Sequence, residues 1–376
     1  MILMKGLYVH VPFCLQKCHY CDFVITTKRS GKDREDFFRA FEKELRQTVS
    51  KYGRLNFETL YLGGGTPSAL EGGEMERLAA LLRSEFDFKL GFEFTCEVNP
   101  GDVDAQKLES YRRAGINRIS LGVQAFQDPL LKDMGRPHTV KDIDETLQAL
   151  RSLGFENISF DLIAGLPKQT LGDYKKSLEK LIELGASQLS LYDLDVHEPT
   201  VYGMRRRRGQ LPVPEEETRA QMYELTCALL PASGYRHYEI STFAKPGYES
   251  KHNQLYWRNR EYLGLGPGAF SYLNGVRYQF ASDMRRYLKK CAEGIWEPDV
   301  EDRLSEEEKE TETLFTGLRL IEGVDLGQFQ IIRKKTEDRL EKAGPYQWFK
   351  RQENKISLSP KGRFFVEKAI GLLIEK

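Results

Sequence analysis

Three cysteines within eight residues form the most reactive group of this sequence. Cys14, Cys18 and Cys21 follow a short apolar segment and lie in a stretch rich in aromatic residues. Thiolates bind zinc and iron, and three of them leave one position of a tetrahedral zinc site or of a cubane iron–sulfur cluster open. The spacing therefore predicts a metal centre with one exchangeable ligand, for which a chelating small molecule is suited.

Zinc or structural thiols are the alternative interpretation of this segment. Zinc ribbons normally carry a second Cys or His pair at similar spacing, and no such pair follows here. The remaining cysteines, Cys96, Cys227 and Cys291, are scattered singly, and we expect them to be small apolar residues of the interior. An iron–sulfur cluster fits the segment better, and a zinc-stabilised scaffold stays as the alternative.

The elements that must position the cysteines alternate between strand and helix. Strands are predicted over residues 6–13, 59–62, 92–98, 118–123, 157–163 and 188–194. Amphipathic helices are predicted between them, for example over residues 33–52 and 140–153. Parallel strands need helical crossovers, so six such units predict an α/β fold, a partial (βα)6 barrel of the TIM type. Ligands gather at the carboxyl ends of its strands.

Polar and glycine residues fall on this same rim of the predicted barrel. Gly64, Gly65 and Thr66 follow the second strand, Glu97 and Gln124 end the third and fourth, and Asp161 lies in the fifth. Glycines allow backbone groups to approach a ligand closely, although a tight turn explains a glycine run as readily. Each polar residue alone could be structural. Their convergence from separate strands predicts a binding site beside the cysteines.

Composition limits the classes of function. The chain has 376 residues, of which 40% are hydrophobic, and a formal net charge of zero, which argues against a nucleic-acid partner. It shows neither a secretory signal nor an apolar run of about 18 residues that could cross a bilayer. We expect a cytoplasmic protein in a reducing compartment, where thiols stay free to bind metal.

The C-terminal part differs in pattern from the rest. Residues 305–310 are highly charged, and amphipathic helical patterns follow at Leu314, Leu318 and Leu320 and again over residues 361–374. We expect residues 1–235 to form the barrel and residues 236–298 to extend it. Residues 299–376 are expected to form a small, mainly helical domain that covers the site or contacts a partner.

Four consecutive arginines at positions 205–208 form a basic run. A solvated loop at a domain edge is one interpretation. The other is a docking patch for carboxylates of a ligand or for an acidic or membrane-bound partner, because guanidinium groups pair well with carboxylates.

The CxxxCxxC spacing of Cys14, Cys18 and Cys21 resembles that of the radical S-adenosylmethionine (radical SAM) superfamily. The segments YVHVPFC, YLGGGTPS, EVNPGD, SLGVQAF, GRPHT and DLIAGLPKQT occur in this order. They resemble the branch that contains oxygen-independent coproporphyrinogen III oxidases and HemW-type heme chaperones. The resemblance covers nearly the whole chain. It implies a three-quarter (βα)6 barrel, open enough for a flat macrocycle, and a winged-helix-like C-terminal domain.

The resemblance also implies cofactors. The three cysteines would hold a 4Fe-4S cluster whose open iron is chelated by S-adenosylmethionine. The positions that match S-adenosylmethionine contacts of the family are Tyr8, Gly64, Gly65, Thr66, Glu97, Gln124, Arg136 and Asp161. The implied chemistry is reductive cleavage of S-adenosylmethionine, with the cluster as electron donor and a further protein to reduce the cluster.

Departures from the oxidase pattern favour heme handling. The oxidases usually carry another cysteine two positions beyond the cluster motif, where this chain has Phe23, and a long lead before the first strand, where it has residues 1–5. His252, Tyr256 and Trp257 form an HNxxYW segment that resembles the heme-chaperone group. An imidazole can ligate heme iron, and aromatic rings can stack on a porphyrin. A packed, hydrogen-bonded histidine is the alternative for this segment.

A second departure concerns the axial ligands of heme. A histidine often follows Gly-Ala in the GxGxGA segment of the family, and this chain has Phe270 there. The five histidines outside the HNxxYW segment receive no catalytic role from the sequence.

We therefore expect a HemW-type chaperone that binds heme and passes it to client hemoproteins, among which membrane-bound respiratory enzymes are candidates. The first alternative is an oxygen-independent coproporphyrinogen III oxidase, which decarboxylates propionate side chains to give protoporphyrinogen IX. The second is the zinc-stabilised scaffold without redox activity. Whether the protein is an enzyme is left open by the sequence.

Overall fold

The computed structural model describes residues 6–374 of the chain. The short lead of residues 1–5, which entered the comparison with the oxidases, lies outside the described residues. No helix in the described part is long and apolar enough to cross a membrane.

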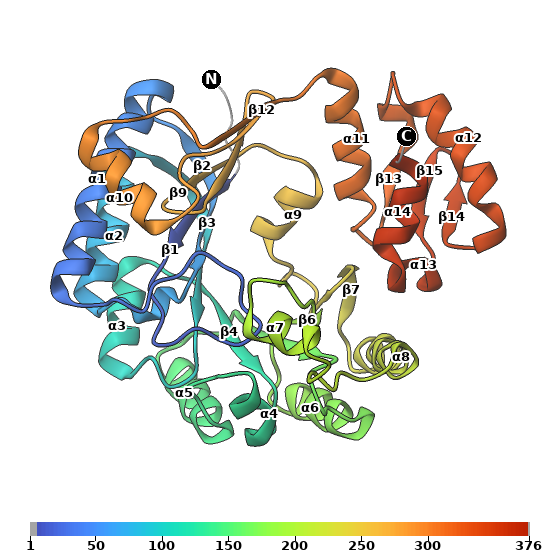
Figure 1. Ribbon diagram of the computed structural model, residues 1–376, viewed down its shortest axis with the longest axis horizontal. Helices are drawn as coiled ribbons and strands as arrows, with labels where there is room; N and C mark the ends of the chain where they lie inside the picture. Colours follow the sequence, from blue (N-terminus) through green and yellow to red (C-terminus); the bar gives the residue numbers. More distant parts are fainter. Residues whose placement is uncertain (1–5, 375–376) are drawn as a thin grey trace.

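Six parallel strands form the wall of an open barrel (Figure 1). In spatial order they are β1 (Gly6–Val11), β2 (Asn56–Gly64), β3 (Asp87–Val98), β4 (Arg118–Gln124), β5 (Ile158–Ala164) and β6 (Gln188–Asp193). The crossover helices that cover the outside are α1 (Gly31–Tyr52), α2 (Gly72–Glu85), α3 (Ala105–Ala114), α5 (Val140–Ser152) and α6 (Leu171–Glu183). The predicted partial (βα)6 barrel is confirmed.

Further strands extend the sheet at both edges. Next to β1 lie β9 (Tyr262–Leu265), β10 (Phe270–Leu273), β11 (Val276–Gln279) and β12 (Val300–Arg303), and next to β6 lie β8 (Thr242–Ala244) and β7 (Arg236–Glu239). Helices α7 (Val201–Arg207), α8 (Glu216–Ala232), α9 (Lys251–Trp257) and α10 (Met284–Glu293) occur in this second part of the chain, and α4 (Asp128–Asp133) follows β4. The described sheet ends in β12 and β7, which do not pair with each other. The barrel is therefore open on one side.

Local sequence explains where the helices begin. Ser30, Thr139 and Thr170 each accept a hydrogen bond from a backbone amide of the following first turn, and an aspartate three residues later completes a capping box. The apolar face of α1, which includes Phe37 and Phe41, is buried against the sheet. Burial of such stripes, rather than helix propensity alone, stabilises these helices.

The first strand is shorter than its pattern predicts, since β1 ends at Val11 and not at residue 13. Pro12 has no backbone N–H for the ladder, and Phe13 instead forms an isolated bridge with Thr26. The cysteine loop therefore leaves the sheet directly at the carboxyl end of β1.

The C-terminal part has its own core, built around Leu314, Leu318 and Ile356. Its helices are α11 (Glu306–Gly317), α12 (Arg333–Ala343), α13 (Pro360–Phe364) and α14 (Val366–Ile374), and its antiparallel sheet consists of β13 (Val324–Asp325), β15 (Lys355–Leu358) and β14 (Phe349–Gln352). The expected helical domain thus includes a small sheet. The single helix expected over residues 361–374 is interrupted at Phe365, whose ring packs against Trp348. The expected division of the chain at residues 235 and 298 stays a prediction.

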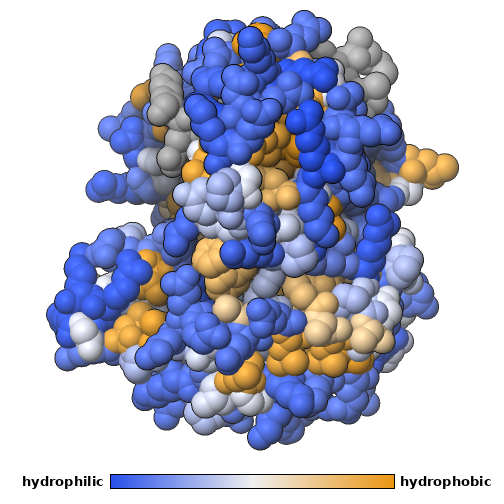
Figure 2. Space-filling view, turned by 90° about the vertical axis from the view of Figure 1, so that its right-hand side faces the viewer, coloured by the Kyte–Doolittle hydropathy of each residue, from blue (hydrophilic) through white to orange (hydrophobic). Residues whose placement is uncertain are grey.

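The surface seen from the side of this C-terminal part is mostly hydrophilic (Figure 2). Hydrophobic side chains gather in and below the middle of that face. This mixed surface agrees with a chain in which 30% of the residues are charged and the signs balance.

Candidate functional site

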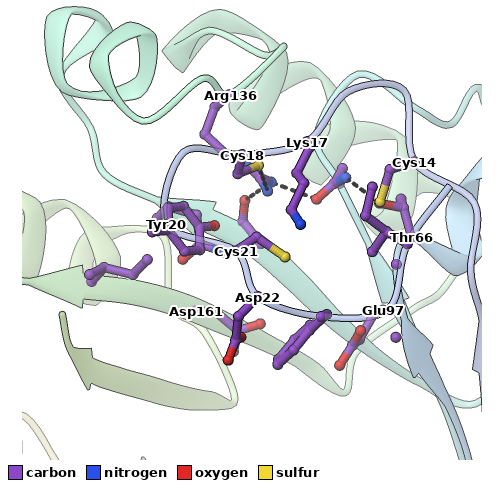
Figure 3. A pocket seen from close by; sticks show the side chains of 18 of the residues that line it. Cys14, Lys17, Cys18, Tyr20, Cys21, Asp22, Thr66, Glu97, Arg136 and Asp161 are labelled. Carbon is purple, nitrogen blue, oxygen red and sulfur yellow. Dashed lines mark hydrogen bonds between the residues drawn. The ribbon is translucent and has the colours of Figure 1, made fainter. Parts of the chain in front are cut away.

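A cavity of about 450 Å³ lies at the carboxyl ends of the barrel strands. Figure 3 shows the three cysteines around one space, with the side chain of Lys17 extending into it and with Glu97 and Asp161 opposite. The predicted residues that line this cavity are Cys14, Cys18, Cys21, Gly64, Gly65, Thr66, Glu97, Gln124, Arg136 and Asp161. The structure therefore brings the cysteines together with seven of the eight residues predicted around them. A cavity of this volume suits a ligand of nucleotide size.

Tyr8 is the exception among the predicted residues. Its side chain lies beside the cavity rather than on its lining, because its hydroxyl is 3.1 Å from His10 Nδ1 and its ring stacks on Tyr61.

The cysteine loop is fixed to the barrel by its backbone. The amide of Cys14 donates to the carbonyl of Thr26 (3.0 Å), and the amide of His19 donates to the carbonyl of Met134 (2.8 Å). Burial raises the pKa of the Cys14 thiol to about 11 and also raises the pKa of Cys21. A bound metal cation would offset the free-energy cost of deprotonating these thiols, because metal binding deprotonates its thiol ligands.

The spacing of the cysteines fits a cluster better than one ion. Among residues 6–374, no three His, Cys, Asp or Glu side chains gather closely enough to hold a single metal ion. In a cubane, each thiolate binds a different iron, so its ligands are spread around a larger body. All six cysteines are free thiols, and Cys96, Cys227 and Cys291 do not line the cavity.

A chain of hydrogen bonds joins two of the cysteines (Figure 3). Arg136 Nη1 lies 3.7 Å from Cys18 Sγ, and Arg136 Nη2 donates to Asn99 Oδ1 (2.5 Å). Asn99 Nδ2 donates to Thr66 Oγ1 (3.0 Å), which lies 3.4 Å from Cys14 Sγ. Because Thr66 accepts from Asn99, its own hydroxyl proton is free to point at the sulfur of Cys14. The network stabilises negative charge on both sulfur atoms.

Asn99 is the residue of this network that the sequence did not single out. It belongs to the EVNPGD segment and follows β3 directly. An asparagine before proline is typical of a turn, so only the contact with Arg136, 37 positions further on, reveals its place in the site.

Two half-buried carboxyl groups form the opposite side of the cavity. Burial raises the pKa of Glu97 to about 7, partly offset by the hydroxyl of Tyr61, which donates to Glu97 Oε1 (2.8 Å). Burial likewise raises the pKa of Asp161 to about 6, although the hydroxyl of Ser120 donates to it (3.0 Å). Both groups can therefore gain or lose a proton near neutral pH.

Several polar atoms of the site lack a partner, which indicates space for a polar ligand. Gln124 Oε1, Asp161 Oδ1 and Arg136 Nε are buried without a hydrogen bond. Gln124 also has a φ of 66°, unusual for a residue with a side chain. Unpaired buried polar atoms and a strained backbone both cost free energy, and both are typical of binding sites. A ligand with amino, carboxylate and hydroxyl groups would satisfy these atoms, so the cavity fits S-adenosylmethionine.

The glycines after β2 are required by close packing. Gly64 has a φ of 111°, and a Cβ on it would lie 2.7 Å from the ring of His10. A Cβ on Gly65 would lie 2.8 Å from the backbone of Pro12. These glycines let the end of β2 pack against the segment that leads into the cysteine loop.

The HNxxYW segment lies at the other end of the strands. His252 Nδ1 is 2.7 Å from Thr59 Oγ1, and Thr59 pairs with Gly6, the first residue of β1. Strand β1 has six residues and spans roughly 17 Å from this point to the cysteine loop, at about 3.3 Å per residue. Neither His252, Tyr256 nor Trp257 lines the cavity.

Both ring nitrogens of His252 are engaged there. Besides the contact with Thr59, its Nε2 lies 2.9 Å from the hydroxyl of Tyr256, and its ring stacks on Tyr61. Burial lowers the pKa of His252 to about 3. Glu93 accepts the backbone amides of Lys251 and His252, which fixes the start of α9. In this structure the segment holds α9 against the interior of β2 and β3, beside the first residue of β1.

The family of the chain follows from comparison with known proteins. The model of the radical SAM superfamily matches residues 8–181. The heme chaperone HemW of Bacillus subtilis is 39% identical over 331 residues, which cover 87% of this chain and 86% of that protein. The chain belongs to the HemW family of radical SAM proteins. Membership in this superfamily implies the 4Fe-4S cluster and S-adenosylmethionine that the cavity fits.

Other members of the HemW family and a solved structure agree. The heme chaperone HemW of Escherichia coli is 38% identical over 265 residues, 70% of this chain and 69% of that protein. The coproporphyrinogen III oxidase HemN of Escherichia coli, a radical SAM enzyme, matches 99% of this chain and 90% of its own with a TM-score of 0.88. At 23% identity this likeness concerns the fold alone, and it supports the barrel with its C-terminal part.

Proposed function

We propose that this member of the HemW family binds heme and transfers it to client hemoproteins. The observation that carries the proposal is the 39% identity with the heme chaperone of Bacillus subtilis across 87% of the chain. The open barrel supports it, since an open side admits a flat macrocycle more readily than a closed barrel does. The proposal includes a cytoplasmic location and an electron donor protein for the cluster.

Cys14, Cys18 and Cys21 would hold the 4Fe-4S cluster, and the cavity beside them would hold S-adenosylmethionine. Bound at these residues, the two groups would supply the chemistry of the superfamily, reductive cleavage of the sulfonium with the cluster as electron source. The residues that would contact S-adenosylmethionine are Gly64, Gly65, Thr66, Glu97, Gln124, Arg136 and Asp161, which line the cavity.

Residues of the chain would orient the cluster and S-adenosylmethionine and set the charge around them. Arg136, fixed by Asn99 and the carbonyl of Gly122 (2.9 Å), places a buried positive charge beside Cys18. Glu97 and Asp161 can carry either a proton or a negative charge near neutral pH, so they can match the charge of an amino or hydroxyl group. Buried charges of this kind act strongly because the surrounding dielectric is low.

Anaerobic heme titration tests the proposal. The protein is purified without oxygen, reconstituted with iron and sulfide, and titrated with ferric heme while the Soret band is recorded. One heme per chain, followed by transfer of that heme to an apo-hemoprotein after mixing, is the expected result. Absence of stoichiometric uptake would refute the proposal.

The same preparation distinguishes the two alternatives. Anaerobic incubation with coproporphyrinogen III and S-adenosylmethionine would yield protoporphyrinogen if the protein were an oxidase. Metal and acid-labile sulfide analysis would find zinc without sulfide if it were a zinc-stabilised scaffold. We expect neither result.

A further inference from the structure

A histidine that ligates heme iron must expose its ring where a flat macrocycle can lie. The chain has six histidines. Five have a ring nitrogen within hydrogen-bond distance of another group: His10 with Val24, His19 with Asp133, His138 with Val123, His237 with Ile240, and His252 with Thr59 and Tyr256. His197 differs, because its side chain is 44% exposed and lines the mouth of the cavity.

Carboxylates flank the ring of His197. Its Nδ1 lies 3.6 Å from Asp22 Oδ2, next to the cysteine motif, and its Nε2 lies 3.4 Å from Asp195 Oδ2. The Asp195 side chain is 79% exposed, so it can turn away and free Nε2. A histidine that keeps a carboxylate on one nitrogen and offers the other to a metal is a common arrangement in metal sites.

The backbone around His197 is firmly held. The hydroxyl of Thr200 donates to the carbonyl of His197 (2.6 Å), and Thr200 also caps the start of α7. Gly203 packs so closely that a Cβ on it would lie 2.3 Å from the same carbonyl oxygen. The imidazole is therefore presented from a fixed loop, between β6 and α7.

Large apolar side chains surround the same mouth. Phe23 is 61% exposed, Leu15 48% and Tyr192 46%, and all three line the cavity. Such a group of exposed apolar side chains marks a binding surface, and aromatic faces suit a flat macrocycle. Phe23 occupies the position where the oxidase pattern has a further cysteine.

Helix α7 adds positive charge beside His197. Arg206 and Arg207 pair with Glu198, and Arg205 pairs with Asp133. Arg208 is exposed and, in the described part of the chain, has no acidic partner within ion-pair distance. It directly follows the last residue of α7. The loop after β1 and α7 lie side by side (Figure 1), where the amide of Tyr202 donates to the carbonyl of His19.

We propose that heme lies across the mouth of the cavity, with His197 Nε2 as a ligand of its iron. This inference rests on the proposed heme-binding function and names the site at which it occurs. The porphyrin face lies against Phe23, and its propionates extend toward Arg208, because guanidinium groups pair with carboxylates. The iron gains the lone pair of a neutral imidazole, and its oxidation state does not change.

Resonance Raman spectroscopy of the reduced heme complex tests this site on cluster-loaded protein. The wild-type complex should show an iron–histidine stretching band. His197→Ala should lose that band and bind heme at least about tenfold more weakly, and added imidazole should restore the band. The control is His237→Gln, which changes a half-buried histidine of β7 that does not line the cavity, and it should keep the band.

A second pair of variants tests the apolar contact. Phe23→Ala should weaken heme binding about fivefold or more. Its matched control is Leu90→Ala, because Leu90 is fully exposed and lies outside the cavity. The control should leave the affinity unchanged.

The outcomes separate this inference from the function on which it rests. If the wild-type protein takes up no heme, the proposed function fails. If it binds heme without an iron–histidine band, or if His197→Ala keeps the band, the site is wrong and the chaperone function stands. Intact cluster absorption and circular dichroism of each variant verify that it is folded.

Discussion

Asn99 determines how hydrogen bonds and positive charge reach the sulfur atoms of the cysteines. Its side chain links Arg136, which faces Cys18, to Thr66, which faces Cys14. Hydrogen bonds and positive charge near cluster sulfurs are a main determinant of reduction potential. One asparagine therefore couples two of the three thiolates to the same buried charge.

Asn99→Ala should lower the reduction potential of the cluster and make the cluster easier to lose. The variant removes one acceptor of Arg136 Nη2 and the donor to Thr66, so each neighbour loses one of the contacts that hold it in place. Anaerobic redox titration with dye mediators, followed by iron analysis after gel filtration, measures both effects. An unchanged potential and iron content would contradict the coupling. Ser84→Ala is the control, since its hydroxyl bonds only a carbonyl on the surface of α2.

At the scale of elements, the packing of the end of β2 against the end of β1 depends on Gly64. An L-residue at a φ of 111° is strained, and its Cβ would overlap His10. Gly64→Ala should therefore destabilise the protein by roughly 1–3 kcal/mol or more and impair binding in the cavity. Gly73→Ala is the matched control, because no atom lies within 4 Å of its added Cβ in α2. Urea unfolding of both variants measures the difference, and equal effects would contradict it.

The buried carboxyl group of Glu44 attaches α1 to the part of the chain that lies beyond β1. Glu44 Oε2 accepts the amide of Gly266 (2.9 Å), which directly follows β9, and the hydroxyl of Tyr287 (2.7 Å) in α10. Burial raises the pKa of Glu44 from 4.5 to about 7. Between these pH values the folded protein keeps a proton that the unfolded chain releases, so this group's contribution to stability falls as pH rises.

Glu44→Gln should remove that pH dependence. Relative to the variant, the wild-type protein should lose on the order of 1–3 kcal/mol of unfolding free energy between about pH 4.5 and about pH 7. Anaerobic urea unfolding at several pH values measures this difference. Glu341→Gln, at an exposed position of α12, serves as control. A difference between wild type and Glu44→Gln that stays constant with pH would show that Glu44 is ionised in the folded state.

The same elements explain how much the sequence could predict. Alternating strand and helix patterns identified all six barrel units, because apolar periodicity follows directly from burial. The motif residues at the ends of the strands line one cavity, because the carboxyl ends of parallel strands share one rim. The end of β1 was missed by two residues because Pro12 interrupts pairing inside an otherwise apolar segment.

Long-range contacts account for what the sequence did not predict. Asn99 and His197 gain their positions from partners far along the chain. His252 belongs to a recognisable segment, but a segment does not say at which end of a barrel its helix will pack. The burial of His252 beside Thr59 is a tertiary result.

On the scale of the whole molecule, residues 319–321 are one of the places where the C-terminal part contacts the barrel and its extension. The carbonyl of Arg319 accepts the amide of Ile240 (3.0 Å), and the amide of Ile321 donates to the carbonyl of Tyr238 (3.1 Å). The guanidinium of Arg319 also pairs with Glu367 in α14. The guanidinium lies 5.6 Å from the ring centre of Trp257 in α9. Trp257, the last residue of the HNxxYW segment, thus contacts the junction between the two parts.

Trp257→Ala should therefore weaken the junction and leave the heme spectrum unchanged. Loss of the cation–π contact and of apolar burial should lower the unfolding free energy by about 1–3 kcal/mol. Limited proteolysis near residues 319–323 and thermal unfolding measure the junction, and the Soret and iron–histidine bands measure heme. Trp257→Phe keeps an aromatic face under Arg319 and should recover much of the stability. If instead Trp257→Ala lost heme while its stability was unchanged, the HNxxYW segment would bind the cargo itself, and the rim around His197 would not.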